Sequence, residues 1–232
     1  MSLVVPAVLP ASRKELEEKL EIFGRMPLVK RIQIDVVDGR LAAPASWPYT
    51  ALEELTAMVA RGEMLPSLDH VEYEMDLMCF DALGGAEPWL ALGATRLTFH
   101  TESSADLPKL LAAARDRLGS FITFGLALNI DSSLALVRPC ASELGYVQFM
   151  GIRTIGRQGQ PFDERVLEKI ETFRRMYPNL PVQVDGGVSL GNAKKLLALG
   201  VVNLVVGSGI LRANDPLAEV EKFEALKGSY GV

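Results

Sequence analysis

The sequence predicts an α/β fold, a closed (β/α)₈ TIM barrel that spans residues 1–232 as a single domain. Runs rich in β-branched and aromatic residues alternate with amphipathic runs, in eight strand–helix units of roughly 25–30 residues each. Eight such units in one domain of this length are typical of a compact barrel. An open doubly wound sheet is the alternative, but no glycine-rich dinucleotide turn follows the first expected strand.

Eight short, largely apolar runs are the expected strands. In chain order they are LVVPAVL from Leu3, VKRIQIDV from Val29, DHVEYEMDLM from Asp69, TRLTFH from Thr95, SFITFGLALN from Ser120, YVQFM from Tyr146, PVQVDG from Pro181 and VNLVVGS from Val202.

Amphipathic runs with recognisable ends are the expected helices between these strands. One opens with Ser12, a favourable cap for a first turn, and stops at Gly24. A second opens with Ser189 and stops at Gly200. A third, residues 161–178, is bounded by a proline at each end.

Composition and charge exclude several classes of partner. Hydrophobic residues make up 49% of the chain and charged residues 23%, as in soluble globular proteins. The net charge is -5 and no basic patch is present, so no nucleic-acid partner is expected. No apolar run is long enough to cross a membrane. We expect a cytoplasmic protein without a signal peptide, in which Cys79 and Cys140 are free thiols.

Side chains alternate along a strand, so each expected strand has an outward apolar set and an inward set. Polar residues dominate the inward set: Gln33, Asp35, Glu74, Asp76, His100, Asn129, Gln148, Gln183 and Asp185. A barrel packed only for stability prefers Val, Ile and Leu at these places. Burial of several carboxylates without compensation is costly. We therefore interpret the inward set as a functional site rather than as structural hydrogen bonding.

Part of the inward set comes at the carboxyl ends of the strands, where the active sites of such barrels lie. These residues are Asp35, Asp76, His100, Asn129, Met150 and Asp185.

Two glycine clusters indicate a phosphate site. Gly186 and Gly187 follow the seventh expected strand, and Gly207, Ser208 and Gly209 follow the eighth. Glycine lets backbone amides approach an anion closely, and the loops after strands seven and eight are the usual phosphate site of the barrel class. The pair of clusters predicts a bound phosphate group, although either cluster alone would also suit an ordinary turn.

The strand ends also carry motifs in a fixed order. IQIDVVDG looks like a second-strand His-x-Asp-x-Met-Asp-Gly motif, YEMDLM like a third-strand Asp-x-His-Leu-Met and LTFHTES like a fourth-strand Thr-x-His-x-Glu. GLALN corresponds to a fifth strand, and VQFMGIRTIGRQGQPF resembles a Met-Thr-Val…Pro-Gly-Phe-Gly-Gly-Gln-x-Phe loop. VDGGV and VVGSGI match the seventh and eighth strand ends. Over nearly its whole length the chain thus resembles the ribulose-phosphate 3-epimerase family, whose barrel is of the ribulose-phosphate-binding type.

The resemblance implies which residues act. It implies that Asp35 and Asp185 are the two acid/base aspartates, one removing a proton and the other returning one through an enediolate. It implies a phosphate clamp and substrate contacts at Gly186, Gly187, Gly207, Ser208, Gly159, Met78 and His100. The implied partner is a small phosphorylated sugar, and barrels of this kind are expected to form homo-oligomers.

The chain departs from the family pattern at three places. The family binds a divalent metal with two histidines and the two aspartates, but the histidine positions are Gln33 and Asp76 here. The first-strand serine, a substrate contact in the family, is Ala7. The loop before Phe162 matches only with one inserted residue.

Two interpretations of the changed metal site stay open. Gln33, Asp35, Asp76 and Asp185 offer only oxygen ligands, which favour Mg²⁺, Mn²⁺ or Ca²⁺ over Zn²⁺. Alternatively no metal binds, and three neighbouring carboxylates raise one another's pKa, which suits an acid/base catalyst.

Three functions are therefore considered. The first is an isomerase that epimerises a phosphorylated ketose of the D-ribulose 5-phosphate and D-xylulose 5-phosphate type at carbon 3. The second is another phosphosugar enzyme on the same barrel, with aldol chemistry like that of a hexulose-phosphate synthase. The third is a non-catalytic phosphosugar-binding paralogue, which the lost histidines, Ala7 and the altered loop favour.

Overall fold

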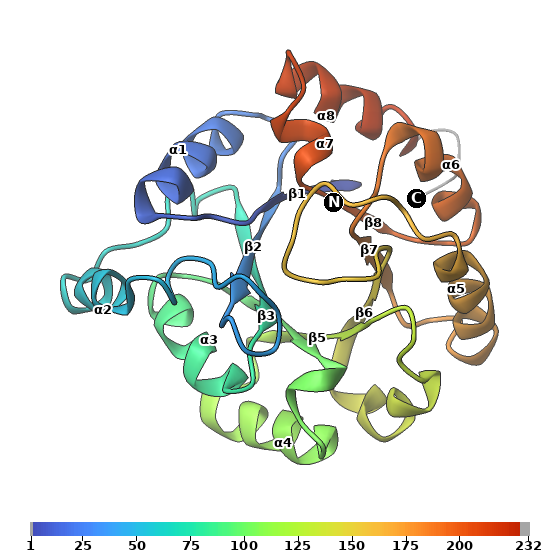
Figure 1. Ribbon diagram of the computed structural model, residues 1–232, viewed down its shortest axis with the longest axis horizontal. Coiled ribbons are helices and arrows are strands. Elements are labelled where there is room, and N and C mark those ends of the chain that lie inside the picture. The colour runs from blue at the N-terminus through green and yellow to red at the C-terminus, as the bar shows by residue number, and fades with distance from the viewer. Residues whose placement is uncertain (1, 228–232) are drawn as a thin grey trace.

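Each strand is hydrogen-bonded to the next one along the chain, and the last strand pairs with the first, so the sheet closes into a parallel barrel (Figure 1). The computed structural model describes residues 2–227. The strands are β1 (Val4–Val8), β2 (Arg31–Val37), β3 (Glu72–Met78), β4 (Arg96–His100), β5 (Thr123–Leu128), β6 (Leu144–Met150), β7 (Val182–Asp185) and β8 (Asn203–Val206). The expected (β/α)₈ barrel is confirmed.

Helices surround this barrel on its outside (Figure 1). They are α1 (Arg13–Gly24), α2 (Leu52–Ala60), α3 (Ala82–Ala91), α4 (Leu107–Leu118), α5 (Arg165–Met176), α6 (Leu190–Ala198), α7 (Ser208–Leu211) and α8 (Pro216–Glu224). One connection differs from the expected regularity: between β5 and β6 the chain forms only two 3₁₀ turns, Leu134–Leu136 and Arg138–Glu143. A proline in the first turn of the second segment suits a short turn of this kind. No helix in the described part of the chain is long and apolar enough to cross a membrane.

The expected helix ends are largely confirmed. The side chain of Ser12 accepts a hydrogen bond from the Glu15 amide and caps α1, and Ser189 forms a capping box with Asn192 at the start of α6. By contrast, α5 begins only at Arg165. Residues 161–164, which were expected to be helical, instead complete the long loop after β6.

The two faces of the strands divide as expected. Outward side chains such as Ile32, Ile34 and Tyr73 are fully buried beneath the helices in one large apolar core. Trp47 and Trp89 meet edge to face in this layer, with ring centroids 5.6 Å apart. The polar inward residues are also buried, so the barrel interior itself is hydrogen-bonded rather than oily.

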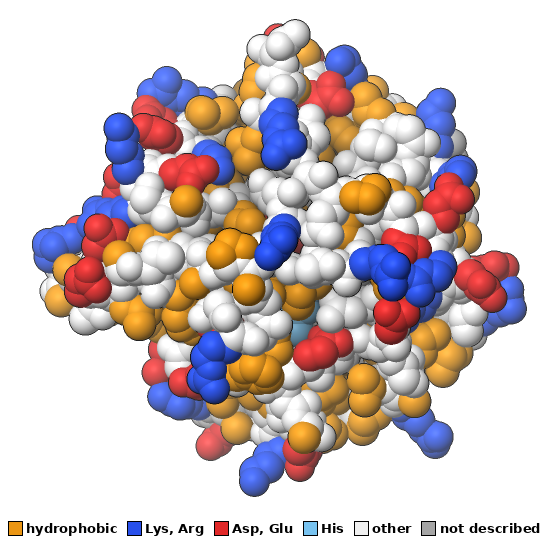
Figure 2. All heavy atoms as spheres, in the orientation of Figure 1, with side chains coloured by type: hydrophobic (Ala, Val, Ile, Leu, Met, Phe, Trp, Pro, Cys, Tyr) orange, Lys and Arg blue, Asp and Glu red, His pale blue; other side chains and the backbone are white. Residues whose placement is uncertain are grey.

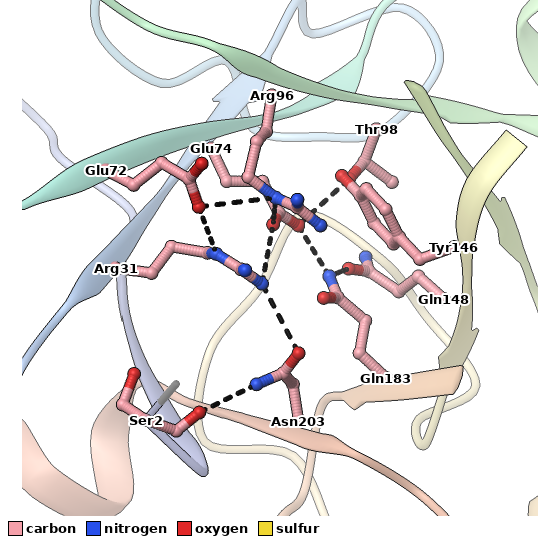
Figure 3. Close-up of polar contacts among 10 residues, drawn as sticks. All are labelled: Ser2, Arg31, Glu72, Glu74, Arg96, Thr98, Tyr146, Gln148, Gln183 and Asn203. Atoms are coloured by element: carbon pink, nitrogen blue, oxygen red, sulfur yellow. Dashed lines mark hydrogen bonds and ion pairs between the residues drawn. The ribbon is translucent and has the colours of Figure 1, made fainter. Parts of the chain in front are cut away.

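Ion pairs close the amino-terminal end of the barrel (Figure 3). Glu74 is completely buried there, and its carboxylate lies 3.0 Å from the Arg96 Nε and 3.7 Å from an Arg31 nitrogen. Arg31 also pairs with Glu72, at 3.0 Å. The guanidinium of Arg96 stacks over the Tyr146 ring, 4.4 Å from its centroid. A buried carboxylate with two cations beside it is compensated, as burial of a charge requires.

Candidate active site at the carboxyl end of the barrel

Three aspartates meet at the carboxyl end of the barrel. Asp35 on β2 pairs in register with Asp76 on β3, and Asp185 ends β7. One carboxylate oxygen of each lies within 4.8 Å of the others, and all three side chains are buried. Inward-pointing residues near the strand ends converge in a closed barrel because its strands tilt around a narrow interior.

The side-chain amide of Gln33 joins two of these aspartates. Its Nε2 donates to Asp35 Oδ1 at 2.9 Å and to Asp185 Oδ2 at 2.8 Å. Its Oε1 is buried and accepts no hydrogen bond from the described residues. The amide therefore presents its hydrogens, not its oxygen, to the pair of carboxylates.

Asp76 is held from behind by a buried hydrogen-bonded chain. It accepts from His100 Nε2 at 2.9 Å and from Gln148 Nε2 at 3.3 Å. Gln148 Oε1 in turn accepts from Gln183 Nε2 at 2.7 Å, and Gln183 also donates to Glu74 (Figure 3). Because the Glu74 carboxylate can only accept, it fixes the direction of both amides and leaves an N–H of Gln148 for Asp76.

Burial and mutual repulsion change the acidity of the aspartates. Desolvation, with a further contribution from Asp76, raises the pKa of Asp185 to about 7. Desolvation and the neighbouring Asp185 raise the pKa of Asp35 well above its ordinary range. For His100, burial opposes protonation, but the Asp76 carboxylate outweighs it and the pKa of His100 is raised. The expectation that the carboxylates raise one another's pKa holds for Asp35 and Asp185.

A cavity of about 60 Å³ lies directly above the aspartates. Its walls include Asp35, Asp185, Met78, Met150, Ala7, Gly186, Gly187, Gly207 and Ser208, together with residues 156–160 of the loop after β6. We call residues 151–163 the lid. Its two ends are joined by a hydrogen bond from the Asp163 amide to the Gly151 carbonyl, at 2.8 Å.

The lid crosses the mouth of the barrel (Figure 1). Figure 2 looks onto the same face, where charged side chains gather mainly around the rim. Arg157 ties the lid to the loop after β2, because its Nε donates to the Ala43 carbonyl at 3.0 Å. Gln158 ties it to the first strand, because its Nε2 donates to the Ala7 carbonyl at 3.3 Å.

The two glycine clusters form one wall of the cavity. Gly186 and Gly187 have φ values of +96° and +67°, and a Cβ on Gly187 would lie 2.7 Å from the backbone of Phe162. Glycine is therefore required there by both conformation and space. Within residues 2–227 the backbone amides of Gly187, Gly207 and Ser208 donate no hydrogen bond, so this wall presents free donors to an anion.

Comparison with known proteins agrees with this geometry. The model of the ribulose-phosphate 3-epimerase family matches residues 3–211. The chain belongs to this family. It is therefore an enzyme of the epimerase class.

Two relatives illustrate the match. The ribulose-phosphate 3-epimerase of Schizosaccharomyces pombe is 30% identical over 215 residues, which cover 92% of this chain and 88% of the relative. That of Helicobacter pylori strain 26695 is 26% identical over 230 residues, or 97% and 98% of the two chains.

Solved structures of low sequence identity share the fold. KGPDC from Streptococcus mutans is 17% identical, with a TM-score of 0.69 and 99% of both chains covered. A second structure of that protein is a complex with a phosphosugar, with a TM-score of 0.68. The 3-hexulose-6-phosphate synthase of Salmonella typhimurium is also 17% identical, with a TM-score of 0.66 and 99% and 100% of the two chains covered.

The three aspartates fit a metal ion of the kind that carboxylates bind. Their oxygens are close enough to share one ion, and an all-carboxylate set suits Mg²⁺ or Mn²⁺ better than Zn²⁺. Gln33 is less suited in this arrangement, because its Nε2 faces Asp35 and Asp185. Its role as a metal ligand stays a prediction that requires its amide to turn over.

The structure gathers most of the predicted site residues and separates two of them. Asp35, Asp185, Met78, Gly159, Gly186, Gly187, Gly207 and Ser208 all line the cavity. His100 does not line it and is completely buried behind Asp76. Asn129 lies beyond the end of β5 and borders a separate hollow on the other side of the lid. Sequence reasoning missed Arg157 and Gln158, because nothing in a loop sequence shows which side chains turn inward.

Proposed function

We propose that this enzyme interconverts D-ribulose 5-phosphate and D-xylulose 5-phosphate by inverting carbon 3. The observation that carries the proposal is the meeting of Asp35 and Asp185 beneath a cavity whose wall presents free backbone amides. One end of that cavity suits a phosphate group and its floor suits proton transfer. The family assignment supports the same activity.

In the proposed reaction one aspartate, as the carboxylate, removes the proton from carbon 3. The electrons of the broken C–H bond form a carbon–carbon double bond to carbon 2, and the ketone oxygen becomes an oxyanion. The other aspartate, in its acid form, returns a proton to the opposite face, and the ketone re-forms. The raised pKa values of Asp35 and Asp185 support this division, because one carboxyl group stays protonated while the other is ionised.

Several neighbouring residues serve this step. Gln33 donates to both aspartates and holds their carboxylates in place. Met78 and Met150 border the cavity with apolar side chains, which suits a planar intermediate kept away from water. A divalent metal held by Asp35, Asp76 and Asp185 would supply positive charge to the oxyanion. His100 orients Asp76 rather than contacting substrate.

The phosphate end of the substrate would lie against Gly187, Gly207 and Ser208. Their unpaired amides are the kind of donor that binds phosphate oxygens. The phosphosugar complex of the Streptococcus mutans protein supports a sugar phosphate as the ligand of this barrel type. Because the lid forms part of the cavity wall, substrate entry would require the lid to open.

We also propose a cytoplasmic location and a homo-oligomeric assembly. The location is supported by a rice relative named as a cytoplasmic isoform, which is 30% identical over 132 residues. It is supported as well by the two cysteines, which are free and buried.

The assay that tests the function is direct. The purified enzyme is incubated with D-ribulose 5-phosphate, and the products are separated and identified by NMR. We expect D-xylulose 5-phosphate to accumulate to an equilibrium ratio. Formation of a hexulose phosphate only when formaldehyde is added, with no epimer in its absence, would contradict the proposal and favour aldol chemistry.

A further inference from the structure

The first strand offers no polar side chain to the cavity. Ala7 lines it with a methyl group that is almost completely buried and packs in a small apolar cluster with Val5 and Val205. The neighbouring wall, Gly207 and Ser208, is where the proposed phosphate site lies. On the β1 side of that site, then, the barrel itself provides only hydrocarbon.

The lid places an amide in this gap. Gln158 is half-buried, lines the cavity and donates from Nε2 to the Ala7 carbonyl at 3.3 Å. It lies so close to Gly207 that a Cβ added there would be 2.4 Å from Gln158 Nε2. Its side chain therefore stands between the end of β1 and the glycine wall.

Part of this amide is available to a ligand. A primary amide carries two N–H donors and one oxygen acceptor. Only the bond to Ala7 uses a donor, and Gln158 makes no other hydrogen bond within residues 2–227. The second N–H and the oxygen are thus unpartnered beside the free amides of Gly207 and Ser208. The other side-chain bonds of the lid serve different ends, since Gln160 donates to carbonyls of the lid itself.

We propose that Gln158 is a substrate-binding residue through which the closed lid recognises the phosphate-bearing end of the substrate. Its free N–H donates to a phosphate oxygen, while its bond to Ala7 holds the amide in place. Gln158 so provides from the lid the polar contact that Ala7 does not provide from the first strand. The inference rests on the proposed function for the identity of the substrate, but not for the binding of phosphate itself.

The experiment compares Gln158→Ala and Gln158→Glu with wild type and with Arg153→Ala, an exposed side chain on the same lid. KM and kcat are measured with D-ribulose 5-phosphate, and the dissociation constant of inorganic phosphate is measured by calorimetry. We expect Gln158→Ala to raise both KM and that dissociation constant about tenfold, with kcat changed less than about twofold. Gln158→Glu should raise them further, because a carboxylate repels the phosphate. Arg153→Ala should leave all three values unchanged.

A rescue variant separates contact from lid stiffness. Ala7→Ser in the Gln158→Ala background restores a donor beside the glycine wall, and it should recover most of the lost phosphate affinity. Unchanged phosphate affinity in Gln158→Ala, or an equal loss in Arg153→Ala, would overturn the proposal. If wild type fails to turn over the pentulose phosphate but binds inorganic phosphate more tightly than Gln158→Ala does, the proposed function fails while the role of Gln158 stands.

Discussion

The amide nitrogen of Gln33 on β2 lies 2.8 Å from a carboxylate oxygen of Asp185 on β7, across the carboxyl end of the barrel. The same nitrogen lies 2.9 Å from Asp35 on its own strand. A neutral side chain therefore links the two aspartates proposed to exchange protons with substrate. The relation explains why a strand that packs Ile32 and Ile34 under the helices also carries an amide and a carboxylate.

Replacement of either aspartate should stop the reaction without unfolding the protein. In Asp35→Asn and Asp185→Asn the amide oxygen can still accept from Gln33, so the local geometry survives. We expect kcat to fall by about 10²- to 10⁴-fold in each, the usual contribution of general acid/base catalysis. Steady-state kinetics measure the loss, and circular dichroism checks the fold. A variant that keeps more than about a third of wild-type kcat would rule out its aspartate as an acid/base group.

Activity should depend on pH through the aspartate pair. The pKa of Asp185 is raised to about 7, and that of Asp35 is raised as well. Below pH 7 both groups become protonated and no base is left, so kcat/KM should fall about tenfold per pH unit. At high pH the acid form is lost and the rate should fall again. Because phosphate esters themselves titrate near pH 6, phosphate affinity over the same range is the control. A rate that stays flat from pH 5 to 8 would contradict the assignment.

Metal preference should follow the identity of residue 33. The wild-type cluster of three carboxylates suits Mn²⁺ or Mg²⁺. Gln33→His places an imidazole nitrogen beside Asp35 and Asp185, and we expect it to improve Zn²⁺ affinity relative to Mn²⁺ by about tenfold or more. Competition calorimetry and elemental analysis of the dialysed proteins measure the ratio. The same ratio in both proteins would show that residue 33 lies outside the metal's reach.

The ion pairs at the amino-terminal end should be important for stability. Arg96→Leu leaves the buried Glu74 carboxylate with only the more distant Arg31, and we expect a loss of about 3 kcal/mol in the free energy of unfolding. Arg25→Leu removes an exposed pair with Glu21 and should cost no more than about 1 kcal/mol. Urea unfolding measures both, and a single transition is expected of the proposed single domain. Equal losses in the two variants would mean that burial does not decide the strength of the pair.

Much of the site follows from strand periodicity. Because side chains alternate, Gln33 and Asp35 had to share a face opposite to Ile32 and Ile34, and closure of the barrel then brought that face to Asp185. The glycines after β7 and β8 were equally legible, since their place in a barrel is that of a phosphate site.

Other features depend on contacts that no local pattern records. His100 has the right parity but points behind Asp76, because a carboxylate from the neighbouring strand binds its ring. Arg31 and Arg96 begin their strands as surface charges would, yet they turn inward to compensate Glu74. The path of the lid, and with it the approach of Gln158 to Ala7, is set by long-range hydrogen bonds rather than by the sequence of the loop.

Solvent exchange at carbon 3 is the most direct test of proton transfer by Asp35 and Asp185. The enzyme is equilibrated with D-ribulose 5-phosphate in D₂O, and NMR follows deuterium at each carbon. We expect deuterium at carbon 3 alone in both epimers with wild type, and none with Asp35→Asn or Asp185→Asn. Conversion of one epimer into the other without deuterium at carbon 3, or exchange that persists in both variants, would contradict the two-aspartate mechanism.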